Sequence, residues 1–382
     1  MEDHNTFSAE QSYQQGLDSF RKSDFDTGIQ YFISAAKQDH MPAIKELGIC
    51  YLHGISLEQD LKKAIVYFKK SKQHPESQFE LCKLFFFGHG VKQDLDLAKK
   101  LLVFAVKNKY LPAVNMMALC YVIAKDIEKA TTLFNLALSN NDRFANHLYQ
   151  QQLIQKNTNT LEFINSFDWP LMKEEYQKDS INNSPEIFEI NNLLSEIECE
   201  YIKFISSPFM RPSMTIDPKT GEHVKDEIRT SFSATVDWLT EDPAINLIMQ
   251  KCCNNFGVNA RQSEVLHVLH YSIGEEYKPH YDFFGGTDDH NNFTADQQRI
   301  KTICLYLNDV EDGGYTTFPN LNKFVEPKKG SAVFFENINP ENNQPYTESL
   351  HAGEPVLKGE KWLATLWIRS HNTNRGICYE SI

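Results

Sequence analysis

The sequence has no long apolar run and no secretory signal, although its 382 residues are enough for two or three domains. No segment approaches the length of a membrane-spanning helix. The first sixteen residues are polar and acidic, without the basic and apolar regions of a signal peptide. We therefore expect a cytoplasmic protein with no membrane partner, and we leave open export into another cell by a non-classical route.

The sequence also lacks a cysteine framework. Its eight cysteines are scattered, with no Cys-x-x-Cys pair and no short set of spacings typical of disulfide scaffolds. Reduced structural thiols are therefore the expectation. We interpret the adjacent Cys252 and Cys253 as helix packing rather than as a redox pair.

Positive charge is scarce in the C-terminal part of the chain. Residues 1–150 hold 18 Lys/Arg and 17 Asp/Glu, so the remainder holds 20 against 34, a net charge of −14. Binding to a phosphate backbone depends on neutralisation by basic side chains. The composition therefore argues against nucleic acid as a substrate or partner.

The first 140 residues repeat a pattern of paired apolar segments with a period near 34. Two positions align in three copies, an aromatic one at Tyr51, Phe85 and Tyr121 and a small one at Ala64, Ala98 and Ala130. A weaker copy covers residues 11–37, and the third strong copy has lost four residues between its two segments. This period is typical of stacked helical hairpins, and the small residue allows the paired helices to approach closely.

The repeats resemble Sel-one-like repeats, which are relatives of the tetratricopeptide repeat, over roughly residues 8–140. The resemblance implies an all-α solenoid over residues 1–140. Most of its aromatic side chains are then core, and a protein or peptide partner would bind on the concave face. No residue identifies that partner.

Residues 141–185 are rich in Asn, Gln and Asp, and we interpret them as a connector with short helices near 143–156 and 159–167. From residue 186 the pattern becomes strand-like. A strand is expected over 186–190, and helices are expected from Asn191 and over 243–256. Alternating strands follow over 263–272, 301–308, 331–337 and 362–370. This order predicts an α + β multidomain chain whose residues 186–382 form a double-stranded β-helix, or jelly roll, with flanking helices.

Four residues of this last region carry the expected chemistry. His280 and Asp282 are two residues apart at a probable strand end, so both side chains project from one face. His351 follows 71 residues later, and Lys361 ten residues after that. Two imidazoles and one carboxylate bind one face of Fe(II) and leave the opposite face open. A lysine beyond the second histidine suits a dicarboxylate co-substrate.

The region from Arg229 to Arg369 resembles the prolyl 4-hydroxylase branch of the Fe(II)/2-oxoglutarate dioxygenases. The matching segments are Tyr271–Phe283, Arg299–Pro319, Val325–Asn337 and Leu350–Arg369. The resemblance implies that His280, Asp282 and His351 bind the metal. Halogenating relatives lack the carboxylate, so the presence of Asp282 favours hydroxylation.

The same resemblance implies the remaining cofactor residues. Lys361 would hold the distal carboxylate of 2-oxoglutarate, with Tyr271 as a hydrogen-bond donor. Either Thr302 or Thr365 would add a hydroxyl. The expected cofactors are Fe(II), 2-oxoglutarate, O2 and ascorbate, and the apolar strands near residues 303 and 332 would wall a dry cavity.

The substrate groove is expected from the same family. Its substrate-binding side chains map onto Arg229, Ser231, Glu264, Tyr277, Arg299 and Trp367. For two of these a plain structural role is an alternative, since Trp367 can be core and Arg229 can form a surface ion pair. The polar segment 285–298 is interpreted as a mobile loop over the groove, with a second metal site at His290 as the weaker alternative.

Three functional hypotheses remain. The first is a prolyl 4-hydroxylase acting on a proline-containing peptide, with the repeats presenting a protein substrate, a layout that collagen-type hydroxylases share. The second keeps the oxygenase chemistry and acts on another side chain or a small molecule. The third is an interaction scaffold whose oxygenase domain senses oxygen or iron.

Overall fold

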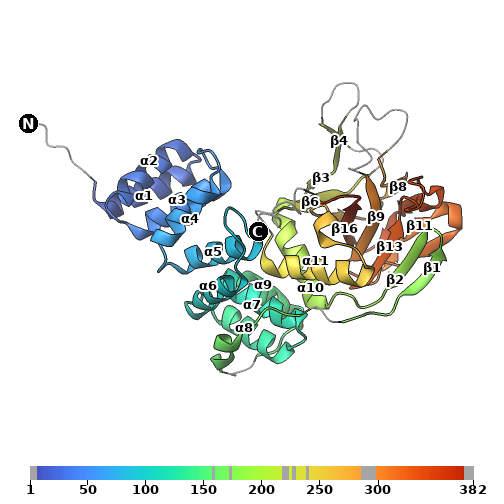
Figure 1. Cartoon of the computed structure of the whole chain (residues 1–382), viewed down its shortest axis with the longest axis horizontal. Coiled ribbons are helices and arrows are strands. Elements are labelled where there is room, and N and C mark those ends of the chain that lie inside the picture. The colour runs from blue at the N-terminus through green and yellow to red at the C-terminus, as the bar shows by residue number, and fades with distance from the viewer. Residues whose placement is uncertain are drawn as a thin grey trace, which may run out of the picture.

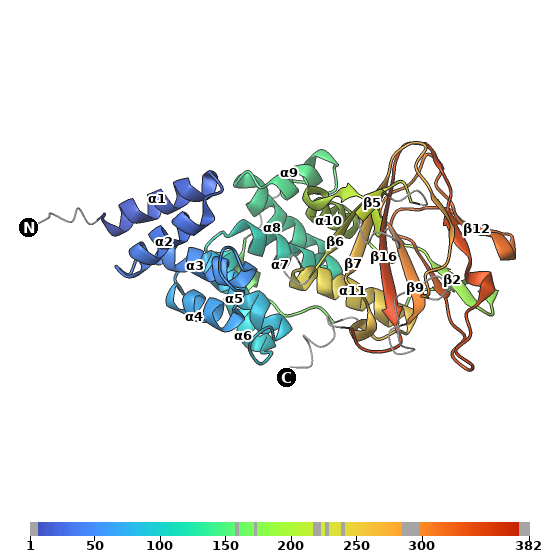
Figure 2. The same ribbon diagram turned by 90° about the horizontal axis from the view of Figure 1, so that it is seen from above.

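A computed structural model describes residues 7–156, 160–171, 174–216, 223–225, 229–237, 241–284 and 298–373. Figure 1 shows a helical N-terminal region at one end and a region of sheets at the other, and the rotated view in Figure 2 agrees. The loop expected over 285–298 lies outside the described residues except for Gln298. Among the described helices, none has the length and apolar character that a membrane crossing requires.

The N-terminal helices form four antiparallel pairs, which confirms the predicted repeats. Their bounds are α1 (Ala9–Arg21) with α2 (Phe25–Ala36), α3 (Met41–His53) with α4 (Leu61–Lys70), α5 (Pro75–Phe87) with α6 (Leu95–Lys107), and α7 (Leu111–Ile123) with α8 (Ile127–Ser139). The weak first copy therefore folds like the others.

Local sequence explains where these helices begin. The second helix of every pair starts at an aspartate whose side chain accepts a hydrogen bond from a backbone N–H three residues later, at Asp24, Asp60, Asp94 and Asp126. A proline lies in the first turn of α3, α5 and α7, where its missing N–H costs nothing. Close helix packing explains the small residues, because a Cβ at Gly48 would lie 2.6 Å from the ring of Phe68.

Helix α7 joins the repeats to the sheet region. All its residues from Ala113 to Ile123 are buried, so it lies inside the molecule rather than on a solenoid surface. It packs against α10 (Glu196–Ser206) and α11 (Pro243–Phe256), while α9 (Arg143–Gln150) packs on α8 and α10. One hydrophobic core consequently runs from the second repeat into the sheets.

Two facing sheets build the C-terminal region. The larger sheet has the strand order β1-β2-β13-β9-β16-β7-β6-β3, and the smaller has the order β12-β11-β14-β8. The strand bounds are β1 (Asp179–Asn183), β2 (Glu186–Ile190), β3 (Arg211–Pro212), β6 (Phe232–Val236), β7 (Leu266–Tyr271), β8 (Tyr277–His280), β9 (Arg299–Tyr306), β11 (Thr316–Phe318), β12 (Lys323–Val325), β13 (Ala332–Glu336), β14 (His351–Gly353) and β16 (Lys361–Arg369). Two further short pairs are β4 (Met214–Ile216) with β5 (His223–Lys225) and β10 (Asp312–Gly313) with β15 (Val356–Lys358). The described pairs are antiparallel, as the predicted jelly roll requires.

Alternate residues of the central strand β16 serve two different environments. Ala364, Leu366 and Ile368 belong to the core that α10 and α11 share with the repeats. Lys361, Leu363 and Thr365 project to the opposite face and line a pocket between the two sheets. The period of two along one strand therefore separates packing from the functional cavity.

Some boundaries differ from the sequence expectation. Helix α10 begins at Glu196 and not near Asn191, because Ser195 and Glu198 form a capping box there. The predicted connector over 141–185 contains the short helix η1 (Glu162–Ser166) and also the strand β1, which pairs with β2 at the edge of the large sheet. Its polar Asn/Asp composition concealed a strand whose side chains are mostly exposed.

Gly330 connects the large sheet to the segment before α10 and should not tolerate a side chain. It adopts φ +79°, its carbonyl accepts a hydrogen bond from Leu194 N at 2.9 Å, and a Cβ there would collide with the Leu194 carbonyl oxygen. We expect Gly330→Ala to lower the free energy of unfolding by about 2–5 kcal/mol, since strain and overpacking add. Gly257→Ala is the control: it has φ +67° with open space, and should cost only about 1–2 kcal/mol. Urea unfolding measures both, and equal losses would contradict the collision.

Candidate active site

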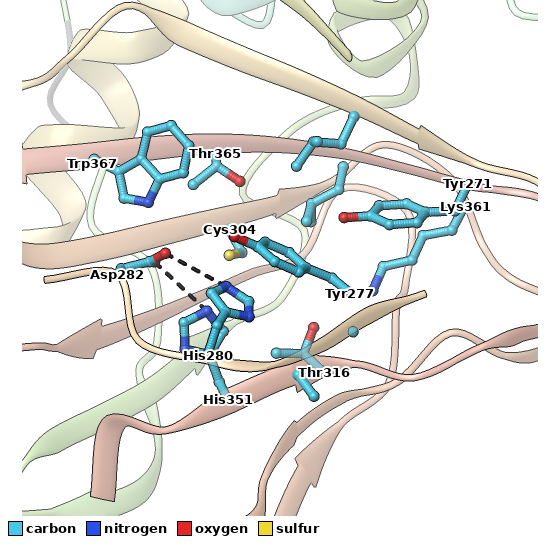
Figure 3. A pocket seen from close by; sticks show the side chains of 14 residues that line it. Tyr271, Tyr277, His280, Asp282, Cys304, Thr316, His351, Lys361, Thr365 and Trp367 are labelled. Carbon is cyan, nitrogen blue, oxygen red and sulfur yellow. Dashed lines mark ion pairs between the residues drawn. The ribbon is translucent and has the colours of Figure 1, made fainter. Parts of the chain in front are cut away.

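The pairing of β8 with β14 brings the two histidines together. His280 and His351 are directly opposite each other in the antiparallel register, and their ring centroids are 4.2 Å apart. Asp282 follows β8, with its Oδ1 3.6 Å from Nε2 of His280 and its Oδ2 3.6 Å from Nε2 of His351. The three ligand atoms lie within 4.8 Å of one another (Figure 3). The residues predicted to bind a metal therefore converge.

Backbone hydrogen bonds orient both imidazoles. Nδ1 of His280 lies 2.8 Å from the carbonyl oxygen of Lys278, and Nδ1 of His351 lies 3.0 Å from that of Ser349. Each Nδ1 carries the proton in this arrangement, so each Nε2 presents a lone pair toward Asp282. Neighbouring rings hold the imidazoles in place, with Tyr277 stacked on His280 at 3.4 Å and Phe335 packed on His351 at 4.6 Å.

The charges of these three side chains favour a cation between them. Burial lowers the pKa of His351 to about 4, so its imidazole is neutral at pH 7. Burial alone would raise the pKa of Asp282, but the nearby side chains of His351, His280 and Arg299 outweigh it and hold that pKa far below its usual range. A buried carboxylate beside the neutral imidazole of His351 needs a partner of opposite charge, which a divalent metal ion would supply.

The hydroxyl of Thr302 supports Asp282, and the predicted contact of Thr302 with the co-substrate stays a prediction. Its hydroxyl donates to Asp282 Oδ2 at 2.7 Å and accepts a hydrogen bond from Asn337 Nδ2 at 2.9 Å. Thr302 and Asn337 are fully buried, and neither lines the pocket. The donor chain holds one carboxylate oxygen and fixes the direction of the other. The alternative hydroxyl, Thr365, does line the pocket and hydrogen-bonds Cys304.

Lys361 lies at the other end of the pocket. It is opposite Tyr271 in the β7–β16 register, and its ammonium lies near the rings of Tyr271 and Tyr306, at 5.8 and 5.7 Å. The side chain is 2% exposed, and Nζ donates to the carbonyl oxygen of Gly314 at 2.7 Å. Within the described part of the chain, no carboxylate forms an ion pair with it, and burial lowers its pKa to about 8.

The two ends belong to one cavity. Figure 3 shows His280, Asp282 and His351 at one side and Lys361 with Tyr271 at the other, with Tyr277, Cys304 and Thr316 between them. Leu269 and Leu363 add apolar wall. A cavity with a metal site at one end and a buried cation at the other can hold a small dianion that also binds the metal.

Comparison with known proteins agrees with this geometry. Residues 266–369 match the 2OG-Fe(II) oxygenase superfamily, and residues 9–40, 42–74 and 75–109 match the Sel1 repeat. Probable prolyl 4-hydroxylase 10 of Arabidopsis thaliana is 34% identical over 218 residues, which cover 52% of this chain and 74% of that protein. The chain belongs to the prolyl 4-hydroxylase-like 2OG-Fe(II) oxygenases. It is an enzyme of that class, with Sel1 repeats at its N-terminus.

Other relatives of this oxygenase include the prolyl 4-hydroxylase subunit alpha-1 of Rattus norvegicus, 34% identical over 49% of this chain and 35% of that subunit. The viral collagen prolyl hydroxylase of Paramecium Bursaria Chlorella virus-1, solved as a 2OG complex, is 29% identical and covers 48% of this chain and 96% of that one, with a TM-score of 0.39. The family implies Fe(II), 2-oxoglutarate and O2. The donor set of two imidazoles and a carboxylate fits Fe(II), and the ammonium of Lys361 fits a carboxylate.

The residues predicted to contact substrate fall into two groups. The first surrounds Tyr277, which lines the pocket, with the Arg229 guanidinium 5.3 Å from its ring. Arg229 Nη1 also lies 3.5 Å from Nε2 of His267. Ser231 is buried and hydrogen-bonds both Ser213, at 2.9 Å, and Tyr271. Ser231 therefore supports the phenol of Tyr271, while Arg229 and Tyr277 stay predictions as substrate contacts.

The second group is an ion-pair cluster on one side of Trp367. Glu264 receives two hydrogen bonds from Arg299, at 2.7 and 2.9 Å, and a third from Arg369 at 2.6 Å. The Arg299 guanidinium stacks on Trp367 at 3.7 Å. Trp367 lines the pocket, and its buried Nε1 has no hydrogen-bond partner among the residues that the structure describes. Arg299 and Glu264 therefore hold the indole, and Trp367 alone of this group reaches the cavity.

Sequence reasoning missed three residues of the site. Asn337 follows the apolar strand β13, and its position in the sequence indicates the start of a turn. Cys304 and Thr316 line the pocket from β9 and β11, yet each lies in a run of mostly buried residues. Alternation along the strand places Cys304 on the same face as Thr302 and Tyr306, and this was the available signal.

Removal of the Thr302 hydroxyl should weaken metal binding. We expect Thr302→Val to reduce the Mn(II) or Co(II) affinity of the metal-free protein by about 10- to 100-fold, because Asp282 loses its orienting donor. Thr302→Ser should restore most of the affinity. Thr317→Val is a matched control, since that hydroxyl donates to Glu354 at 2.9 Å away from the histidines. Titration without 2-oxoglutarate measures all three, and equal affinity of Thr302→Val and Thr317→Val would refute the role.

The depressed pKa of Lys361 predicts a pH dependence for 2-oxoglutarate binding. The ammonium is charged below about pH 8 and is lost above it, so the Kd should rise about tenfold per pH unit on the alkaline side. In Lys361→Arg the cation persists, and the profile should be flat between pH 7 and about 9.5. Calorimetry on the Mn(II)-loaded protein gives both curves. A flat profile for the unmodified protein would contradict this assignment.

Proposed function

We propose that the chain is a peptidyl-prolyl 4-hydroxylase dependent on Fe(II) and 2-oxoglutarate. The observation that carries the proposal is the single pocket that joins the convergent His280, Asp282 and His351 to the buried ammonium of Lys361. A co-substrate that chelates a metal at one end and carries a carboxylate at the other suits these two ends. The relatives are named as prolyl 4-hydroxylases, which supports proline as the target.

Each residue has a defined task in this proposal. Nε2 of His280, Nε2 of His351 and one oxygen of Asp282 would hold Fe(II), and Lys361 with Tyr271 would hold the distal carboxylate. When bound, iron, 2-oxoglutarate and O2 supply the oxidation of an unactivated C–H bond, with succinate and CO2 as by-products. The protein fixes both ligands in advance, so less ordering is needed when the substrate arrives.

The pocket walls would protect this chemistry from water. Leu269, Leu363 and the ring of Tyr277 enclose the space between the metal site and Lys361. An apolar lining limits oxidation without substrate. Tyr277 and Trp367 present rings at the pocket, and a proline ring packs well against aromatic faces. A peptidyl proline is therefore the preferred substrate over a small polar molecule.

The Sel1 repeats supply a surface for a protein substrate or its carrier, and we propose that they deliver it. Ascorbate is proposed as a reductant that restores Fe(II) after turnover without substrate. The composition of the chain supports action in a reducing, cytosolic environment, where its thiols stay reduced.

The activity is tested with proline-containing peptides, Fe(II), 2-oxoglutarate and ascorbate. We expect succinate to form together with a +16 mass shift on proline. His280→Ala should abolish both, because the metal loses a ligand. Lys361→Ala should raise the KM for 2-oxoglutarate by about 100-fold or more, since a buried charge-assisted contact contributes about 3 kcal/mol.

Other outcomes separate the alternatives. A +16 shift on a residue other than proline would keep the oxygenase and remove the prolyl assignment. Metal binding without succinate formation, across peptides and proteins that co-purify with the repeats, would favour a sensing scaffold. Lys358→Ala is the control, because that exposed lysine pairs with Glu311 outside the pocket and should leave turnover unchanged.

A further inference from the structure

The connector after α9 packs along the ends of the last two repeats. Phe163 and Phe167 contact the ring of Tyr121 at 5.5 and 5.7 Å, and Trp169 contacts Phe86 at 4.8 Å. These contacts lie where the first helix of each repeat ends. The segment from Leu161 to Leu171, here called the aromatic segment, therefore occupies a surface of repeats three and four.

Polar contacts fix the aromatic segment in place. The indole N–H of Trp169 donates to the carbonyl oxygen of Leu95 at 3.1 Å, in the first turn of α6. Asp168 pairs with Lys99 at 3.3 Å. Aromatic and acidic side chains of one short segment thus meet aromatic and basic side chains of the repeats.

The second repeat has the equivalent tyrosine and lysine positions, but the aromatic segment does not extend over them. Tyr51 is the equivalent of Tyr121, and a lysine lies over each ring, Lys63 at 5.1 Å and Lys129 at 5.3 Å. Tyr121 is 8% exposed beneath the aromatic segment, whereas Tyr51 is only half-buried, with Tyr67 stacked beside it at 5.4 Å. The position that is filled in repeat four is therefore accessible in repeat two.

An open pocket of about 720 Å³ lies between these two regions. Leu95, whose carbonyl receives the Trp169 indole, lines it on one side, and Lys69 of α4 lines it on the other. Phe85 is also in its wall, and Lys69 lies 5.6 Å from that ring. The pocket thus continues from the tip of the aromatic segment toward the second repeat.

Helix α4 makes this surface positive. Its ten residues contain Lys62, Lys63, Lys69 and Lys70 and no acidic residue. Asp60 pairs with Lys63 at 3.4 Å, whereas no carboxylate among the described residues forms an ion pair with the other three. The pocket wall itself is balanced, since Lys69 and Lys92 line it together with Asp94 and Asp96, so the other lysines of α4 give the face its positive charge. This face is therefore positively charged, although the chain as a whole has a net charge of −13.

We propose that this face, formed by Tyr51, Lys63, Tyr67, Lys69, Lys70 and the adjoining pocket, docks an extended acidic and aromatic segment of a protein partner. The partner segment would continue the row that the aromatic segment begins on repeats three and four. Its aromatic rings would pack at Tyr51 and in the pocket, and its carboxylates would meet Lys69 and Lys70. This docking role rests on the proposed function, in which the repeats deliver a protein substrate, and it assigns the surface and the chemistry of that protein.

The chain provides its own probe. A fluorescent peptide with the sequence of residues 161–171 is acidic and carries three aromatic rings. We expect saturable binding to the full-length protein by fluorescence anisotropy, with no metal or 2-oxoglutarate present. Tyr51→Ala and the double variant Lys69→Glu/Lys70→Glu should each raise its Kd tenfold or more. A peptide with alanine at its three aromatic positions should bind at least tenfold more weakly.

The matched control is Lys100→Glu/Lys107→Glu, which makes the same charge change on exposed positions of α6 and should leave the Kd unchanged. Absence of saturable binding overturns the proposal. Equal Kd values for Tyr51→Ala, Lys69→Glu/Lys70→Glu and the unmodified protein also overturn it. The peptide would then bind on repeats three and four, by displacing the aromatic segment from its own site. Binding of phosphatidylserine vesicles in place of the peptide would assign the face to lipid. The assay needs no turnover, so its failure leaves the hydroxylase test unaffected.

Discussion

The active site depends on the register between β8 and β14. That pairing places His280 opposite His351. The carboxylate of Asp282, two residues after the end of β8, then lies near both Nε2 atoms. A shift of one residue would turn either imidazole to the other face of the small sheet. The backbone carbonyls of Lys278 and Ser349 add a second constraint, since they fix which nitrogen of each ring faces the carboxylate.

Two strands of the large sheet connect the pocket to the hydrophobic core. Strand β16 places Lys361 in the pocket and Leu366 in the core under α10 and α11. Strand β9 does the same with Cys304 and Ile303. Substitutions on the core face therefore have a route to the pocket through the backbone of these two strands. The same strands supply side chains to the pocket and to the core, but the two sets of side chains are different.

The sequence was most informative where function depends on residues close together in the chain or in a fixed order. The repeats and the succession of strands along the chain follow from periodicity and alternation. The residue types and spacing of the histidines, Asp282 and Lys361, together with the family resemblance, indicated the site. The hydrogen bond from Thr302 to Asp282 was not predicted, because it depends on how the chain after β8 crosses β9. Asn337 was missed for a similar reason, since the β13–β9 pairing decides that its amide reaches Thr302. Local patterns carry no information about such contacts between distant segments.

The shared core has a consequence for how a bound partner would be presented. Helix α7 is buried on all sides, and Phe144 of α9 packs on Tyr201 and Phe204 of α10 at 5.2 and 5.1 Å. Separation of the repeats from the oxygenase domain would expose this apolar surface to water, which is unfavourable. The last repeats therefore keep a fixed orientation to the sheets, whereas the first helices pack in a separate cluster. A protein held on the second repeat would consequently approach the pocket from a restricted set of directions, and this restriction would select among target residues that are chemically alike.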